Sequence, residues 1–187
     1  MDITNGYLSL ILGPMFSGKS TKLIQIINKY KTLNKKMLII KPSIDNRYTT
    51  TADICTHNMQ TQSCICIDHL ALDIVFDMDD YTTSNIIIIE EGQFFENIYQ
   101  TICQMLTDKK LIYISALNGD SNRELFGDIY KLIPICDNIE FLQSLCLDCS
   151  DGTPAIFSKR LNTNNQNKIL VAGSTEYKAV CRHHYFN

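Results

Sequence analysis

A segment near the start of the chain has the spacing of a phosphate-binding loop. Residues 13–20 read GPMFSGKS, which matches the pattern G-x-x-x-x-G-K-[ST]. In this pattern the backbone N–H groups surround phosphate oxygens, and the following helix adds the positive end of its dipole. Lys19 would place a charge near the β- and γ-phosphates, and the Ser20 hydroxyl could bind Mg²⁺. We predict that nucleotide contacts come from Gly13, Pro14, Met15, Phe16, Ser17, Gly18, Lys19, Ser20 and Thr21. The alternative is a chance glycine-rich turn.

Two neighbouring carboxylates, Glu90 and Glu91, follow a predicted strand at residues 85–89, which consists of Asn85 and four isoleucines. A phosphate-loop protein needs a carboxylate at the end of such a strand to help hold Mg²⁺. Because successive side chains of a strand point to opposite sides, one carboxylate could face the metal and the other the acceptor. An acceptor hydroxyl loses its proton during phosphoryl transfer, and a positioned carboxylate can take it. We therefore predict Glu90 on the metal side and Glu91 as the general base, with a solvated acidic turn as the alternative.

Two short motifs near the C-terminus have the spacing of metal ligands. Cys146 and Cys149 form C-x-x-C, and Cys181 and His184 form C-x-x-H. Together they could hold one tetrahedral Zn²⁺ in a closed, structural site. His183 is a competing fourth ligand, although the x-x spacing favours His184. Free buried thiols and a redox pair are the alternatives, but a redox pair would not need the second motif.

Apolar periodicity indicates the elements that would position these residues. We predict strands at 7–12, 37–40, 85–89 and 111–116, and helices at 19–30, 70–76, 95–106 and 123–132. Apolar strands that alternate with amphipathic helices are typical of an α/β fold with a mainly parallel sheet flanked by helices. After residue 142, cysteines and Asn-rich turns replace this pattern. We therefore predict a nucleotide-binding domain at 1–141 and a small zinc-binding domain at 142–187.

Composition and charge narrow the possible functions. The 187 residues carry 17 Lys and Arg against 20 Asp and Glu, a net charge of −3, which disfavours a nucleic-acid-binding surface. The 45% hydrophobic and 20% charged residues are typical of a globular protein. No secretory signal and no long apolar run are visible, so we expect no membrane partner and a reducing compartment without disulfides. The cysteines outside the two motifs are expected to be small core residues: Cys55, Cys64, Cys66, Cys103 and Cys136.

Several segments, in order, resemble the type II thymidine kinases of cells and poxviruses, and they extend over almost the whole chain. The segments are GPMFSGKST at 13–21, DNRY at 45–48, TH at 56–57, EGQFF at 91–95, ALNG at 116–119, SKRL at 158–161 and YKAVCR at 177–182. The resemblance implies a recombinase-like P-loop core and a small C-terminal zinc domain that carries a lasso loop. It also implies ATP-dependent phosphorylation of the 5′-hydroxyl of thymidine, a step of DNA precursor salvage.

The resemblance further implies roles for single residues. Glu91 would be the general base, with Lys19 and Arg47 as catalytic partners. Asp45, Glu90 and Gln93 would join the phosphate loop in binding ATP and Mg²⁺. The thymidine pocket would be lined by Met15, Phe94, Leu117, Ser121, Phe126, Ser158, Leu170, Val171, Ala172, Gly173 and Tyr177. From the residues alone, core packing is the simpler interpretation of Phe94, Leu117 and Phe126. A homotetramer, dTTP as feedback inhibitor and a cytoplasmic location, in the host if the chain is viral, are also implied.

The sequence departs from the family pattern at a few positions. Glu90 and Asn118 stand where Asp is usual, Ser121 stands where a pocket Phe is common, and Ala172 replaces a Gly. Because a lost aromatic wall would relax nucleoside binding, a broader deoxynucleoside kinase is the second hypothesis. A non-catalytic nucleotide-binding zinc protein is the third, and it leaves EGQFF and SKRL unexplained.

Overall fold

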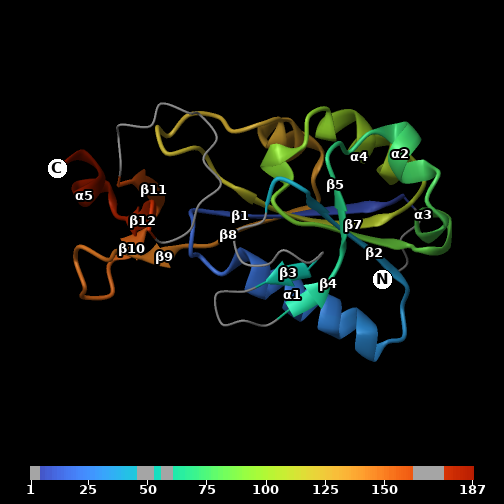
Figure 1. Ribbon diagram of the computed structural model, residues 1–187, viewed down its shortest axis with the longest axis horizontal. Helices are drawn as coiled ribbons and strands as arrows, with labels where there is room; N and C mark the ends of the chain where they lie inside the picture. Colours follow the sequence, from blue (N-terminus) through green and yellow to red (C-terminus); the bar gives the residue numbers. More distant parts are fainter. Residues whose placement is uncertain (1–4, 46–52, 56–60, 162–174) are drawn as a thin grey trace.

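The central element of the fold is a six-stranded sheet with the strand order β5-β2-β6-β7-β1-β8 (Figure 1). The computed structural model describes residues 5–45, 53–55, 61–161 and 175–187. The strands are β1 (Tyr7–Gly13), β2 (Met37–Pro42), β5 (Ile65–Ile67), β6 (Ile86–Ile89), β7 (Leu111–Leu117) and β8 (Asn138–Phe141). Each neighbouring pair of these strands is parallel. The predicted α/β fold with a mainly parallel sheet is therefore confirmed.

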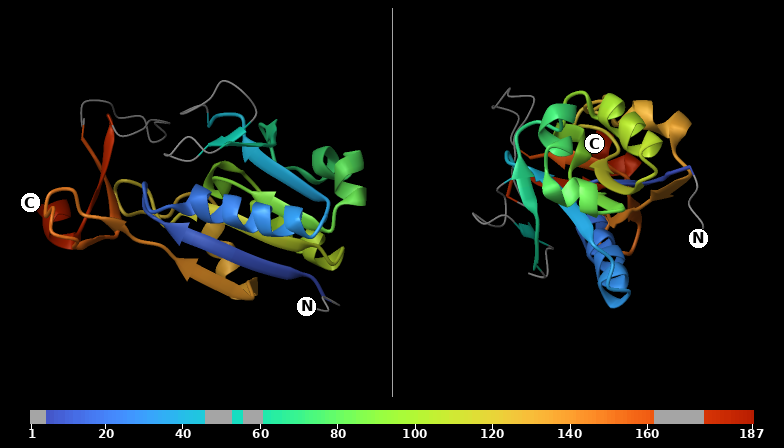
Figure 2. Two further views of the ribbon diagram at one scale, coloured as in Figure 1. Left: turned by 90° about the horizontal axis from the view of Figure 1, so that it is seen from below. Right: turned by 90° about the vertical axis from the view of Figure 1, so that its right-hand side faces the viewer.

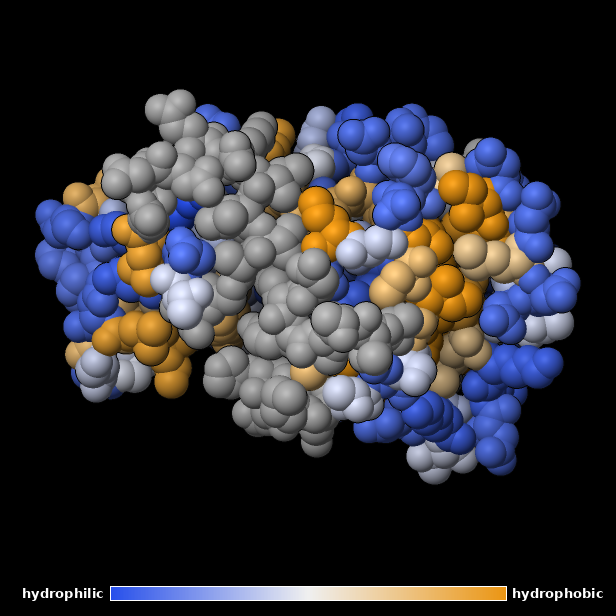
Figure 3. Space-filling model, in the orientation of Figure 1, coloured by the Kyte–Doolittle hydropathy of each residue, from blue (hydrophilic) through white to orange (hydrophobic). Residues whose placement is uncertain are grey.

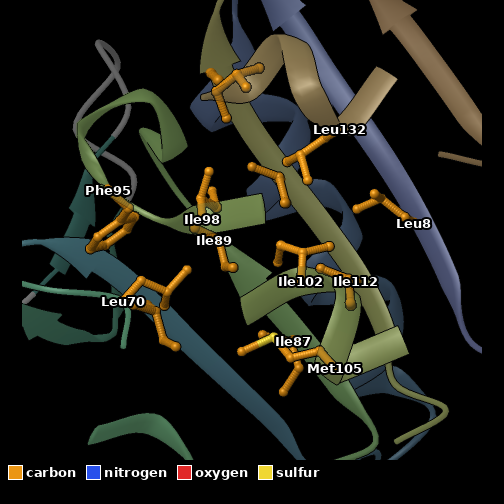
Figure 4. Packing of buried hydrophobic residues seen from close by; sticks show 14 of the residues in the cluster. Leu8, Leu70, Ile87, Ile89, Phe95, Ile98, Ile102, Met105, Ile112 and Leu132 are labelled. Carbon is orange, nitrogen blue, oxygen red and sulfur yellow. The ribbon is translucent and has the colours of Figure 1, made fainter. Parts of the chain in front are cut away.

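The two faces of the sheet are covered by different elements (Figure 2). The helix α1 (Lys19–Thr32) and the hairpin of β3 (Asp53–Cys55) and β4 (Thr61–Ser63) pack on one face. The other face carries α2 (Leu72–Phe76), α3 (Asp79–Thr83), α4 (Ile98–Thr107) and the 3-10 helix η2 (Ile129–Ile135). Alternate residues of one strand serve the two faces: Ile87 and Ile89 pack toward α4 (Figure 4), and Ile86 and Ile88 toward α1. This two-sided burial explains the unbroken run of isoleucines.

A small module follows the sheet at the C-terminal end, and we call residues 144–161 and 175–187 the C-terminal module. It consists of two antiparallel two-stranded sheets, β9 (Ser144–Leu145) with β10 (Pro154–Ala155) and β11 (Phe157–Arg160) with β12 (Tyr177–Val180), and of helix α5 (Arg182–Phe186). Figure 3 shows that hydrophobic residues reach the surface at this end of the molecule, and Leu145 and Phe186 are more than half exposed. Its small apolar cluster also receives Phe16 from the phosphate loop.

The prediction of a helix at 123–132 is wrong, because only its last residues are helical. Residues 118–128 form a loop, and η2 begins at Ile129. Arg123 and Gly127 have φ angles of 68° and 61°, which no right-handed helix contains. A Cβ atom on Gly127 would lie 2.3 Å from the carbonyl oxygen of Gln93, so the chain passes close to the segment after β6.

Two other details differ from the sequence-based expectation. Helix α4 begins at Ile98 rather than at residue 95, because Gly92–Phe94 form the 3-10 turn η1 and Asn97 is left-handed. Strand β8 was not predicted from the sequence, and it pairs with β1 at the edge of the sheet. None of the helices in the described part of the chain has the length and apolarity that crossing a bilayer requires.

Candidate active site and metal centre

One edge of the sheet gathers most of the residues that the sequence singled out. Because the strands are parallel, the carboxyl ends of β1, β6 and β7 meet at the same edge, where ligands bind in open α/β sheets. Strand β1 ends at Gly13 and leads into the phosphate loop, β6 leads into Glu90, and β7 ends at Leu117. Strand β7 lies between β1 and β6. The phosphate loop and the carboxylates thus share an edge one strand apart.

The phosphate loop has the local features of an anion site. Gly18, with a φ of 86°, precedes α1, and neither a side-chain cap nor an acidic residue satisfies the first turn of that helix. The Ser17 hydroxyl is buried and has no hydrogen-bond partner among the described residues. The Lys19 ammonium donates to the Pro14 carbonyl oxygen at 2.8 Å. A buried orphan hydroxyl beside an uncapped helix N-terminus fits the phosphates of a nucleotide.

At Gly13 the phosphate loop has no room for a side chain, and at Phe16 its backbone is strained. A Cβ atom on Gly13 would lie 2.6 Å from both the Leu142 carbonyl oxygen and the Ser17 hydroxyl. Phe16 is left-handed, with a φ of 63°, while its side chain packs against the C-terminal module. The module therefore helps to hold a strained position of the loop.

The two carboxylates are both buried, but they are not consecutive strand residues as predicted. Glu90 continues the ladder, because its N–H donates to the Ile40 carbonyl oxygen at 2.9 Å. Glu91 has left the extended conformation and has a φ of 51°. Glu90 and Glu91 are 3% and 5% exposed, respectively. The turn at Glu91, rather than strand alternation, separates the two carboxylates.

A hydrogen-bonded relay fixes the Glu91 carboxylate. The Gln93 side-chain amide donates to Glu91 Oε2 at 2.5 Å, and Gln93 Oε1 accepts from the Leu117 N–H at 3.1 Å. Gln93 is almost completely buried. Gln93 was expected to contact nucleotide, whereas its amide here joins the predicted base to the end of β7. Local spacing could not reveal this, since the second contact comes from another strand.

A buried cation near these carboxylates was missed from the sequence. Lys41 lies in β2, its Nζ is 3.8 Å from Asp45 Oδ2, and it donates to the Asp53 carbonyl oxygen at 3.0 Å. Burial and the charge of Glu90 raise the pKa of the Cys55 thiol, whereas the charge of Lys41 lowers it. Glu90 and Lys41 therefore both lie close enough to Cys55 to act on its thiol. The available signal in the sequence was a lysine directly after the apolar run at 37–40, within the same buried strand. Because lysine is rarely buried without a partner, this position could have predicted a nearby carboxylate.

The described candidates for the thymidine pocket form separate pairwise contacts. The Phe94 and Phe126 rings meet edge to face, with centroids 5.3 Å apart. The Met15 N–H donates to the buried Ser158 hydroxyl at 2.9 Å, which links the phosphate loop to β11. Ser121 points its carbonyl elsewhere, toward the C-terminal helix.

The remaining predicted site residues divide between placed and undescribed positions. Tyr177 is buried and begins β12, where it pairs with Arg160 of β11. The residues that lie outside the described ranges are Arg47, Leu170, Val171, Ala172 and Gly173.

The four predicted metal ligands come together at one point of the C-terminal module. The Nδ1 atom of His184 lies 3.5 Å from Cys146 Sγ, 3.3 Å from Cys149 Sγ and 3.5 Å from Cys181 Sγ. Cys149 Sγ and Cys181 Sγ are 3.8 Å apart, and all four atoms lie within 4.8 Å of one another. Zn–S bonds of about 2.3 Å and Zn–N bonds of about 2.0 Å produce tetrahedral edges of about 3.5–3.8 Å. The donor set and its spacing therefore fit zinc.

The neighbouring histidine does not belong to this group. The His183 ring is exposed, and its Nδ1 meets the side-chain amide of Asn187 at 3.3 Å. His184 is the histidine that faces the sulfur atoms, as the x-x spacing favoured.

The thiols of the cluster differ in acidity. Burial disfavours the thiolate of Cys146, but hydrogen bonds from the backbone N–H groups of Cys181 and Cys149 and from nearby side chains outweigh it and lower the pKa to about 6. Burial and the neighbouring sulfur atoms raise the pKa of Cys149 to about 11. A bound cation would favour both thiolates, because metal binding releases ligand protons.

Comparison with known proteins identifies the family. The family model of thymidine kinase matches residues 6–185. The chain is 36% identical over 190 residues to the thymidine kinase of Rabbit fibroma virus (strain Kasza), a match that covers 100% of this chain and 99% of the relative. It is 39% identical over 181 residues to the thymidine kinase of Sheeppox virus (strain KS-1), covering 97% of each. It is 35% identical over 185 residues to that of Vaccinia virus (strain Western Reserve), covering 99% of each. Since the family model and these relatives extend over nearly the whole chain, the chain belongs to the thymidine kinase family.

Proposed function

We propose that this chain transfers the γ-phosphate of ATP to the 5′-hydroxyl of thymidine, forming dTMP and ADP. The observation that carries the proposal is the buried Glu91 carboxylate, which the Gln93 amide holds at the same sheet edge as the phosphate loop. Membership of the thymidine kinase family supports the acceptor.

The reaction assigns a role to each group at this edge. Glu91 takes the proton of the 5′-hydroxyl while the 5′-oxygen of the nucleoside bonds to the γ-phosphorus. The bond from that phosphorus to the β–γ bridging oxygen breaks, and ADP leaves. Lys19 and the loop amides stabilise the charge on the phosphates, and Arg47 and Asp45 act beside them. Ser20 and Glu90 would hold Mg²⁺, which neutralises developing phosphate charge.

The nucleoside pocket is proposed on the opposite side of Glu91 from the phosphates. The edge-to-face pair of Phe94 and Phe126 supports an aromatic wall for the thymine ring. Met15, Leu117, Ser158 and Tyr177 complete the pocket together with residues 170–173 of the lasso.

The Cys₃His centre is proposed as a structural zinc site within the C-terminal domain, residues 142–187, which follows the nucleotide-binding domain, residues 1–141. Zn²⁺ would join Cys146 and Cys149 to Cys181 and His184 and so pin the base of the lasso loop between them. Four protein ligands leave no open position for catalysis, so Zn²⁺ would supply stability rather than a Lewis acid. The family resemblance also supports a homotetramer, inhibition by dTTP and a cytoplasmic location.

A broader deoxynucleoside kinase is the second candidate. It is favoured by Ser121, which stands where the family commonly has an aromatic pocket residue. A small side chain at this position would tolerate other bases.

A coupled assay with ATP and Mg²⁺ tests both candidates, with thymidine, deoxyuridine, deoxycytidine and deoxyguanosine as acceptors. Thymidine turnover should dominate, and comparable kcat/KM values for all four would favour the broader kinase. Glu91→Gln should lower kcat by roughly a hundredfold or more while ATP still binds, because the base can no longer accept a proton. The control is Glu96→Gln at an exposed neighbouring position. Near-normal kcat in Glu91→Gln would remove Glu91 from the base role.

A further inference from the structure

The C-terminal helix contacts the 118–128 loop through its residue next to the metal ligand. The Tyr185 hydroxyl donates to the Ser121 carbonyl oxygen at 2.6 Å. The Arg123 guanidinium lies 4.6 Å from the centroid of the Tyr185 ring and 4.5 Å from that of Phe186. Two independent interactions, a hydrogen bond and a cation–π contact, thus join α5 to one turn of the loop.

Tyr185 is fixed on the side of the metal centre. It follows His184 directly, its N–H donates to the Cys181 carbonyl oxygen at 3.0 Å, and its ring packs at 5.1 Å from that of Phe157. Lys159 binds the end of the same helix, because its ammonium donates to the His184 carbonyl oxygen at 2.8 Å. The position of the phenol therefore depends on the four-ligand cluster.

The loop on the other side is ordered locally but leads toward the nucleoside pocket. One oxygen of Asp120, Oδ1, accepts from the N–H groups of Asn122 and Glu124, each at 2.8 Å. This turn presents the Ser121 carbonyl to Tyr185, and a few residues later Phe126 packs against Phe94. A shift of the turn would therefore move one wall of the aromatic pair.

We propose that Tyr185 is a positioning residue for the nucleoside, through which the Cys₃His centre holds the 118–128 loop and the Phe126 side chain in place. This inference rests on the proposed function, because the pocket at Phe94 and Phe126 belongs to it. Tyr185 acts through Ser121 and does not touch the reacting atoms. The effect should consequently appear in nucleoside binding and not in the chemical step.

The test is Tyr185→Phe, which removes the hydroxyl and keeps the ring beneath Arg123. The KM for thymidine should rise roughly two- to tenfold, the range expected for one lost hydrogen bond, while kcat and the KM for ATP stay within about twofold. Arg123→Gln, which removes the second contact, should shift the KM for thymidine in the same direction. The matched control is Tyr130→Phe on η2, a partly exposed tyrosine, which should change none of these values.

Two readouts that do not need turnover separate this link from the proposed function. Tyr185→Phe should keep one zinc per chain, and its amide hydrogen exchange should increase at residues 118–126 while residues 146–149 stay protected. Loss of zinc, or an equal rise in both KM values, would reduce Tyr185 to a structural role and overturn the proposal. Unchanged hydrogen exchange at residues 118–126 in Tyr185→Phe would overturn the link between Tyr185 and the loop. This result does not depend on turnover. A parent protein that is inactive on thymidine would instead contradict the proposed function. An exchange increase with an unchanged KM for thymidine would also overturn the positioning role.

Discussion

Glu91 occupies a backbone conformation that a residue with a side chain adopts at a cost. Its φ of 51° lies in the left-handed region, which is unfavourable by about 1 kcal/mol or more for residues other than glycine. The carboxylate is nevertheless buried and receives the Gln93 amide. The surroundings thus determine both the strain and the aim of this side chain.

The relay through Gln93 makes a prediction about pH. Gln93→Met removes the amide that favours the ionised form of Glu91 and keeps a side chain of similar length. Without this hydrogen bond the ionised form is less favoured, so the acidic limb of the kcat/KM profile should move to higher pH. The measurement is the pH dependence of thymidine phosphorylation.

The control for this measurement is Gln100→Met on an exposed position of α4, which should leave the profile unchanged. An acidic limb at the parental pH in Gln93→Met, with Glu91→Gln still inactive, would show that the amide does not act on the base.

The 118–128 loop shows how one glycine can override a helical pattern. The apolar spacing at 123–132 is typical of a helix, but Gly127 has a φ of 61° and lies against the backbone of Gln93. The pattern is local, whereas the close approach comes from the segment after β6. A sequence-based prediction weighs the first and has no access to the second.

Gly127→Ala is therefore expected to destabilise the fold strongly. The left-handed φ contributes about 1 kcal/mol, and the contact of the new Cβ atom with the Gln93 carbonyl contributes about 1–3 kcal/mol more. The measurement is the free energy of unfolding from urea denaturation.

Gly152→Ala serves as the matched control. Gly152 has a φ of 91°, but a Cβ atom there would meet nothing within 4 Å, so only the strain of about 1 kcal/mol applies. Equal losses in the two variants would contradict the close approach at Gly127.

At the scale of the whole molecule, the C-terminal module contacts the phosphate loop and the 118–128 loop at once. Phe16 packs into its apolar cluster, Ser158 accepts from the Met15 N–H, and Tyr185 binds Ser121. The apolar cluster of the module is small, so a metal would supply much of its stability. Loss of the centre should therefore affect both sides of the active site.

His184→Ala tests this dependence. The variant should lose the single bound zinc, melt at a lower temperature than the parent and bind thymidine more weakly. A chelator should lower the melting temperature of the parent but should not lower that of the variant further. Zinc analysis, thermal unfolding with and without chelator, and thymidine titration provide the measurements.

The matched control is His183→Ala, because His183 is adjacent to His184 but its ring contacts Asn187 and not the sulfur atoms. The His183→Ala protein should therefore retain zinc. His184→Cys should restore zinc binding, since four thiolates also form a tetrahedral site. A His184→Ala protein that keeps one zinc per chain would contradict the assignment of the ligand.

The sequence by itself determined the features that depend on neighbouring residues: the phosphate-loop spacing at 13–20, the two metal motifs, the buried strands and the α/β class. These signals survive without a structure because a loop, a metal knuckle or a strand is encoded within a few residues of the chain. Only the tertiary structure decided the strand order, the turn at Glu91, the hold of Gln93 on it from the end of β7, the burial of Lys41 and the bond from Tyr185 to Ser121. Each of these joins residues that lie on different elements or changes a backbone angle through such a contact. Local periodicity carries no information about that kind of proximity, which arises when the parallel sheet brings strand ends to one edge.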